Sequence, residues 1–128
     1  MQKPEPINEV PPKPADFLGP DDEWRVYWWL TKHNVAFEYQ VSVMGGRKQI
    51  GGLVPDFLIT DRVPPLAINV QGEYWHFGNS GLAAANLMTK IQLLNRGYDV
   101  VYVREDDLYA RLDYTMQQAL QGIQLYQD

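Results

Sequence analysis

The stretch that decides the fold is Val54-Pro55-Asp56-Phe57-Leu58-Ile59, followed after a turn by Leu66-Ala67-Ile68-Asn69-Val70-Gln71-Gly72-Glu73-Tyr74-Trp75-His76. Both segments are rich in the apolar residues that favour strands, and each carries polar side chains at one end. Asp56 lies near the start of the first segment, and the second ends with the amide of Gln71, the acid of Glu73 and the imidazole of His76. Groups of these kinds can hold a divalent cation beside a phosphodiester, so the two segments form the candidate site.

The spacing of the polar residues predicts that they meet. Side chains alternate along a strand, so Gln71 and Glu73 share one face with Asn69 and lie roughly 6–7 Å apart. Asp56 precedes Gln71 by 15 residues, a gap that a hairpin fills. If the two strands separate at this end, the oxygens of Asp56, Gln71 and Glu73 suit Mg²⁺ or Mn²⁺. His76 can then move a proton near neutral pH.

Length and charge limit the function classes. The 128 residues are enough for one domain with a single core. A net charge of −5 counts against tight binding to duplex DNA through phosphate contacts alone, because such contacts come from Lys and Arg. It does not exclude a nuclease whose acids bind a metal. The chain has no cysteine, so disulfides and thiolate metal sites are excluded.

The chain carries no sign of a membrane or secretory segment. No apolar run approaches the roughly 20 residues of a membrane span, and the N-terminus lacks a signal pattern. The expected location is therefore cytoplasmic, or a virion if the chain comes from a phage.

Residues 1–19 are predicted to form a proline-rich arm, ahead of a domain that spans residues 20–128. Six of the nine prolines lie in residues 1–20, in runs such as Pro11-Pro12-Lys13-Pro14. Proline fixes φ and removes a backbone donor, so the arm is expected to be extended and outside the core. Two interpretations stay open, a disordered tail or an arm that lies on its own domain or on a neighbouring subunit.

The hydrophobic pattern predicts the element order α-β-β-β-α-β-α, an α/β fold with a mixed central sheet flanked by helices. Short, turn-rich links predict that the first three strands are antiparallel neighbours, and a helical crossover predicts a parallel fourth strand. The expected elements are a helix at about 20–33, strands at about 37–43, 54–60 and 66–74, a helix at about 82–95, a strand at 99–103, and a helical region at about 106–126 with a break near Asp113.

Two helices carry apolar faces that are expected to pack on the sheet. The tryptophans of the first helix, at positions 24, 28 and 29, are expected to be core anchors. Gly97 is predicted to end the second helix in a left-handed cap. The predicted inner face of that helix consists of Ala84, Leu87, Met88, Ile91 and Leu94.

These motifs resemble the PD-(D/E)XK nuclease superfamily, and within it the very-short-patch-repair (Vsr) endonucleases and the EDxHD homing endonucleases. The resemblance covers residues from about 20 to 110 and is carried by Glu23, by Pro55-Asp56-Phe57, by Gly72-Glu73-Tyr74-Trp75-His76 and by the segment from Leu94 to Glu105. It implies a restriction-endonuclease-like fold. It also implies a metal-dependent endonuclease in which Glu23 is the acid on the first helix, Asp56 the metal-binding aspartate and His76 the catalytic histidine.

The chain departs from the family pattern at three points. The usual (D/E)-x-K falls on Gln71-Gly72-Glu73, so Gln71 stands in place of the acid and Glu73 in place of the lysine. The aspartate that the EDxHD pattern expects on the second helix is absent, and Asn86 and Thr89 lie near its place. Lys90 either substitutes for the missing lysine or is a solvated surface residue.

Two hypotheses therefore stay open. The first is a small DNA endonuclease from a phage or mobile element, with Mg²⁺ or Mn²⁺ held by Asp56 and Glu73 and with Gln71, Glu23 and His76 completing the site. The second is a catalytically degenerate relative that acts as a structural component of a larger complex such as a virion, with the arm contacting a protein partner.

Overall fold

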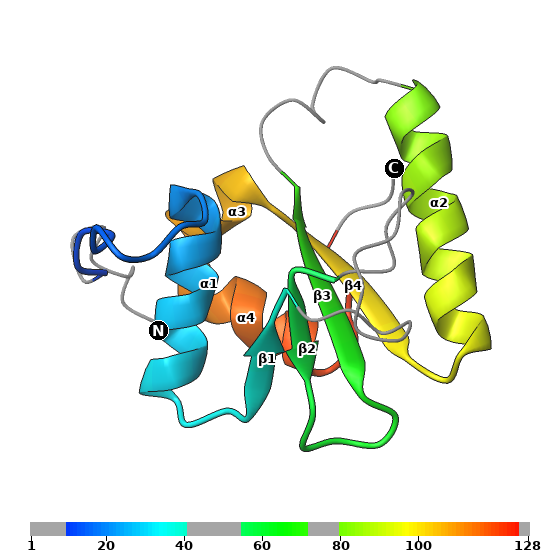
Figure 1. Cartoon of the computed structure of the whole chain (residues 1–128), viewed down its shortest axis with the longest axis horizontal. Coiled ribbons are helices and arrows are strands. Elements are labelled where there is room, and N and C mark those ends of the chain that lie inside the picture. The colour runs from blue at the N-terminus through cyan, green and yellow to red at the C-terminus, as the bar shows by residue number, and fades with distance from the viewer. Residues whose placement is uncertain (1–9, 41–54, 72–79, 126–128) are drawn as a thin grey trace.

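The computed structural model describes residues 10–40, 55–71 and 80–125, and the side chains of residues 80–86 are not among those described. The predictions at Glu73 and His76 therefore lie outside the described residues. Figure 1 shows the arrangement of the elements. In chain order they are α1 (Asp21–Lys32), β1 (Phe37–Tyr39), β2 (Phe57–Ile59), β3 (Leu66–Gln71), α2 (Ser80–Asn95), β4 (Asp99–Arg104), α3 (Glu105–Ala110) and α4 (Leu112–Leu120).

The four described strands form one mixed sheet in the order β1-β2-β3-β4. β1, β2 and β3 are antiparallel neighbours, and β3 and β4 are parallel, with α2 as the crossover between them. This confirms the predicted α/β fold with a mixed central sheet and flanking helices. On β2 the pairing with β3 begins at Phe57, opposite Ile68, so Asp56 lies just beyond the regular ladder.

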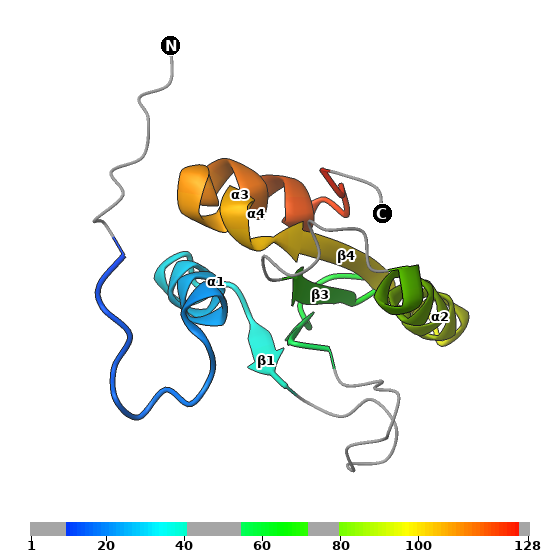
Figure 2. The same ribbon diagram turned by 90° about the horizontal axis from the view of Figure 1, so that it is seen from above.

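Helices cover the two faces of the sheet unequally. Figures 1 and 2 show α1, α3 and α4 gathered on one side and α2 alone on the other. The small core under α2 contains Ala67, Leu93, Val100 and Tyr102. The larger core on the opposite side consists of Val26, Trp29, Leu30, Phe57, Ile59, Leu66, Ile68, Val101, Val103, Leu108, Leu112, Met116 and Ala119.

The prediction for the tryptophans of α1 is confirmed at one position of three. Trp29 is buried against the larger core, whereas Trp24 and Trp28 are only half-buried. Trp28 packs at the edge of the larger core, whereas Trp24 is covered by the described part of the arm, residues 10–19. The indole Nε1 of Trp24 donates to the carbonyl of Pro11 at 2.8 Å, and the ring of Phe17 lies 5.3 Å from that of Trp24. The arm therefore lies on its own domain over these residues.

The predicted inner face of α2 is wrong. Leu87, Met88, Ile91 and Leu94 are 58, 57, 42 and 46% exposed, whereas Leu93 is completely buried. Successive helical residues are about 100° apart, so burial of Leu93 in place of Leu94 means that the packed side of the helix is turned by roughly that angle from the predicted one. Since α2 is apolar on more than one side, its periodicity does not determine which side packs on β4.

The ends of the helices follow their local sequences. Gly97 has φ 90° after α2, and the N–H groups of Gly97 and Tyr98 donate to the carbonyls of Leu94 and Leu93, which confirms the predicted left-handed cap. The predicted last helix is two helices, α3 and α4, separated at Arg111, where φ is −155°. None of the helices within the described ranges is long and apolar enough to cross a membrane.

Candidate functional site

Asp56 lies at the point where the ladder between β2 and β3 stops. Its backbone N–H donates to Oδ1 of Asn69 at 2.9 Å, and the N–H of Val70 donates to Oδ2 of Asp56 at 2.8 Å. Side chains thus replace the carbonyls that a regular ladder would use at these two positions. The arrangement holds the partly buried Asp56 carboxyl group against the backbone of β3.

Glu23 approaches from the first turn of α1. Its Oε1 accepts a hydrogen bond from the hydroxyl of Tyr39 at 2.5 Å and another from Nε2 of Gln40 at 3.2 Å. Tyr39 ends β1, and the backbone N–H of Gln40 donates to the carbonyl of Asp56 at 2.9 Å. Two consecutive residues at the end of β1 therefore contact both acids, Glu23 through side chains and Asp56 through the backbone.

The two acids influence each other electrostatically. Burial, together with the negative charges of Glu23 and Asp22, raises the pKa of Asp56 to about 7, and the hydrogen bond from the Val70 N–H opposes part of the rise. Burial also raises the pKa of the Tyr39 phenol well above its ordinary value, helped by its hydrogen bond to Glu23 and by the charges of Glu23 and Asp56. Asp56 therefore changes its charge close to neutral pH, and it does so beside a second carboxylate.

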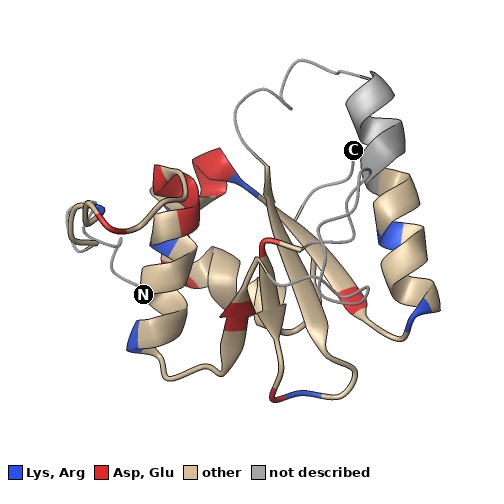
Figure 3. Ribbon diagram, viewed as in Figure 1, with Lys and Arg blue, Asp and Glu red and all other residues tan. Residues whose placement is uncertain are grey.

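Further acids surround the pair. Asp21, Asp22 and Glu23 occupy the first turn of α1, and the first turn of α3 is acidic as well. Figure 3 shows these two helix ends as neighbouring patches of Asp and Glu. Burial raises the pKa of Asp22, and the charges of Glu105 and Glu23 add to the rise. This end of the molecule therefore attracts cations and repels phosphate groups.

The structure brings together two of the five predicted site residues, Glu23 and Asp56. Gln71 is the last residue of β3 and is only 2% exposed. Glu73 and His76 lie outside the described residues. Lys90 is half-buried on α2.

A metal ion would find a limited ligand set in the described part of the chain. Residues 10–40, 55–71 and 80–125 contain no group of three or more Asp, Glu, His or Cys that could hold a metal ion. Carboxylate oxygens are nevertheless the ligands that Mg²⁺ prefers, and this ion is commonly held by only one or two carboxylates while keeping several waters. The chemistry of the Asp56 and Glu23 donors therefore fits Mg²⁺ or Mn²⁺.

Three residues that contact the acid pair were not predicted as site residues, namely Asn69, Tyr39 and Gln40. Asn69 carried a signal, because strand alternation places it on the same face as Gln71. Tyr39 carried none, since an aromatic residue at an alternating strand position is most simply a packing residue. Comparisons of the chain with protein-family models, with curated proteins and with solved structures found no match.

Proposed function

We propose that the chain is a metal-dependent hydrolase of phosphodiester bonds in DNA, with Asp56 and Glu23 in its active site. The observation that carries the proposal is the acid pair itself. One carboxyl group from α1 and one from the residue before β2 are held near each other by hydrogen bonds, although their charges repel. A pKa as strongly raised as that of the Asp56 carboxyl is typical of functional sites, and a bound divalent cation would relieve the repulsion between the two acids.

The motifs supply the remaining roles. Asp56 is proposed as a metal ligand together with Glu73. Because the N–H of Val70 donates to Oδ2 of Asp56, Oδ1 is the oxygen proposed for the cation. Mg²⁺ or Mn²⁺, when bound, would polarise a phosphoryl oxygen and ease deprotonation of water. Glu23 would orient the attacking water, and His76 would transfer a proton. The Gln71 amide would join Asp56 and Glu73 at the cation.

A second candidate function is a degenerate nuclease fold that serves as a structural component of a larger complex such as a virion. The observation that favours it is the acidic surface around the pair, where the first turns of α1 and α3 meet. Such a surface repels a DNA backbone unless cations neutralise it. The two candidates therefore differ in whether the acids bind a divalent cation.

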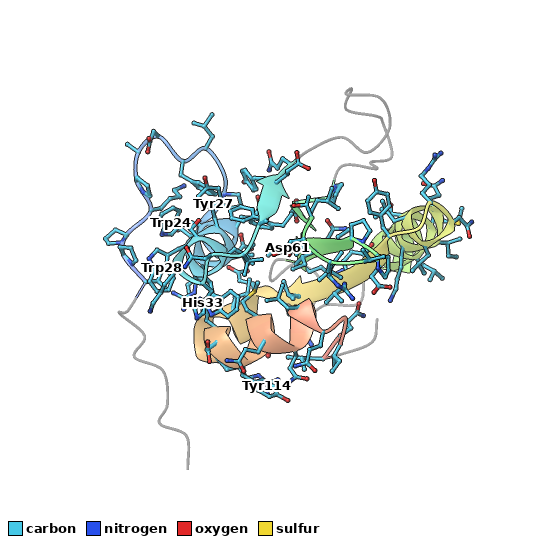
Figure 4. All side chains as sticks on the ribbon, turned by 90° about the horizontal axis from the view of Figure 1, so that it is seen from below. Trp24, Tyr27, Trp28, His33, Asp61 and Tyr114 are labelled. Atoms are coloured by element: carbon cyan, nitrogen blue, oxygen red, sulfur yellow. The ribbon has the colours of Figure 1, made fainter. Side chains whose placement is uncertain are left out.

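Calorimetry with Mn²⁺ and nicking of supercoiled plasmid test the proposal. We expect wild-type protein to bind Mn²⁺ and to nick the plasmid, and Asp56→Asn to lose both activities. Asparagine can still accept the hydrogen bond from Val70, so the loss would not reflect a broken strand pair. Asp61→Asn is the matched control, because Asp61 is an exposed acid in the hairpin after β2 (Figure 4). Wild-type protein that neither binds Mn²⁺ nor nicks DNA would favour the structural candidate.

A further inference from the structure

The arm packs an aromatic ring behind the residue that holds Glu23. Phe17 contacts three rings, with centroid distances of 5.3 Å to Trp24, 5.3 Å to Tyr27 and 5.4 Å to Tyr39. Figure 4 shows Trp24, Tyr27 and Trp28 on the side of α1 where the arm runs. The arm therefore contributes to the same cluster of rings that holds the phenol of Tyr39.

Gly19, the last residue of the arm, contacts the hydroxyl of that phenol. A Cβ atom at Gly19 would overlap the Tyr39 hydroxyl oxygen and would lie 2.9 Å from the Phe17 ring and 3.3 Å from Oε1 of Glu23. Only a residue without a side chain fits this space unless the tyrosine or the arm shifts. The arm thus closes on the hydrogen bond between Tyr39 and Glu23 and does not merely lie near it.

We propose that Tyr39 is a positioning residue for Glu23, and that the arm, through Phe17 and Gly19, sets the place of the Tyr39 hydroxyl. The assignment rests on the proposed function for its catalytic meaning. The hydroxyl of Tyr39 and the amide of Gln40 both engage Oε1 of Glu23. Oε2 is thereby oriented, and it is the oxygen assigned to the cation or to its bound water. A segment outside the sheet therefore controls the geometry of the acid pair.

The contact has a physical basis in side-chain entropy. A glutamate in the first turn of a helix loses considerable rotamer freedom when it is fixed, and a short hydrogen bond to a carboxylate is strong enough to oppose that loss. A positioned carboxylate supports metal binding much better than a mobile one, since supporting hydrogen bonds around metal ligands affect affinity strongly. Removal of one oxygen atom from Tyr39 is thus expected to loosen Glu23 without removing any acid.

Three full-length variants separate this role from general packing. Tyr39→Phe removes the hydroxyl and keeps the ring. Tyr27→Phe is the matched control, because Tyr27 belongs to the same ring cluster and contacts both Phe17 and Tyr39. Gly19→Ala tests the arm, since it keeps both Tyr39 and Glu23 and adds only a methyl group at the hydroxyl.

The first readout needs neither metal nor activity. NMR relaxation of ¹³C-labelled Glu side chains reports how rigidly Glu23 is held on the picosecond to nanosecond timescale. We expect a high order parameter for Glu23 in wild type and in Tyr27→Phe, and a clear decrease in Tyr39→Phe and in Gly19→Ala. Equal rigidity in wild type and Tyr39→Phe would overturn the positioning role. Unchanged rigidity in Gly19→Ala would overturn the part assigned to the arm.

The second readout is the dissociation constant for Mn²⁺. Loss of a supporting hydrogen bond is expected to weaken binding about 10-fold in Tyr39→Phe, and Tyr27→Phe is expected to bind as wild type does. Unchanged Mn²⁺ affinity in Tyr39→Phe would contradict the catalytic meaning of the positioning. Wild-type protein that binds no Mn²⁺ would refute the proposed function, and the relaxation data would still decide whether Tyr39 and the arm fix Glu23.

Discussion

The helices α1 and α2 are both apolar on more than one side, yet among the residues that the structure describes only α1 has a cover on its second side. The buried side of α1 faces the larger core, and its outer aromatic side lies under residues 10–19. On α2, Leu93 is buried and its neighbours at positions 87, 88, 91 and 94 are substantially exposed. An apolar face in a sequence thus indicates that something can pack there, but it does not indicate what does.

The two sides also differ in chemistry. The α1 side carries the acid pair and the acidic first turns of α1 and α3. Among the described residues of α2, by contrast, the only charged side chain is that of Lys90. Extra packing and unfavourable charge therefore occur together on the α1 side. Such a combination is expected where favourable packing offsets the free-energy cost of clustered like charges at a candidate functional site.

The largest expected effect tests the orientation of α2. Leu93→Ala should destabilise the protein by about 2–5 kcal/mol, because it leaves a cavity beside β4, whereas Leu94→Ala should change stability by no more than about 0.5 kcal/mol. The two leucines are neighbours with the same helix propensity, so each serves as the control for the other. Urea unfolding measures both values. A larger loss at Leu94 would restore the inner face predicted from the sequence.

A slightly smaller effect concerns the charge on Asp56. Its pKa is about 7 in the folded protein and near 3.8 without burial, so the folded state binds the proton more tightly than the unfolded chain. Stability should therefore fall as the pH rises from about 4 to about 7, and should level off above that. The shift of about three units sets an upper limit of ~4 kcal/mol, and relaxation around the site should reduce this to about 2–3 kcal/mol.

The substitution Asp56→Asn isolates the contribution that ionisation of Asp56 makes to the free energy of unfolding. Asp56→Asn should be more stable than wild type at pH 8 and nearly equal to it at pH 4, because asparagine carries no charge at either pH. Thermal unfolding across this range, with Asp61→Asn as the control, gives the comparison. A stability gain that is the same at both pH values would show that ionisation of Asp56 is not its cause.

The packing of the arm is expected to contribute less than the core. Phe17→Ala removes a half-buried ring that contacts three others, and we expect a loss of about 1–2 kcal/mol, below the value for a fully buried ring. Leu18→Ala is the control, since Leu18 is 96% exposed. Equal effects of the two substitutions in chemical denaturation would mean that the arm adds nothing to the stability of the α1 side.

Much of the fold could be predicted from the sequence, because local signals were strong where they succeeded. The alternating strands, the turn-rich links and the crossover through α2 fix the mixed sheet, and Gly97 marks the end of that helix. The faces of α1 and α2 could not be predicted, since tertiary packing decides between two apolar sides. The break at Arg111 was expected near Asp113, two residues later, which is the usual error for the ends of elements.

The candidate site was predictable only in part, for a similar reason. Asp56 and Glu23 were identified from a motif, and the structure places them near each other. The residues that hold them are Tyr39, Gln40 and Asn69, and these act through hydrogen bonds between segments 13–17 residues apart in the chain. Such bonds depend on strand register and loop closure, which a residue pattern does not encode. The roles of Glu73 and His76 remain predictions.

The smallest expected effect distinguishes a fixed arm from one that merely rests on α1. Trp24→Phe keeps an aromatic ring beside Phe17 but removes the indole N–H that donates to the carbonyl of Pro11. An exposed hydrogen bond of this kind contributes about 0.5–1 kcal/mol, so global stability should change little. The amides of Val10 and Lys13, which flank Pro11 and Pro12, should nevertheless become more mobile in ¹⁵N relaxation, and Trp28→Phe should leave them unchanged. If neither substitution alters these amides, ring packing alone holds the arm, and the polar anchor that distinguishes α1 from α2 has no role.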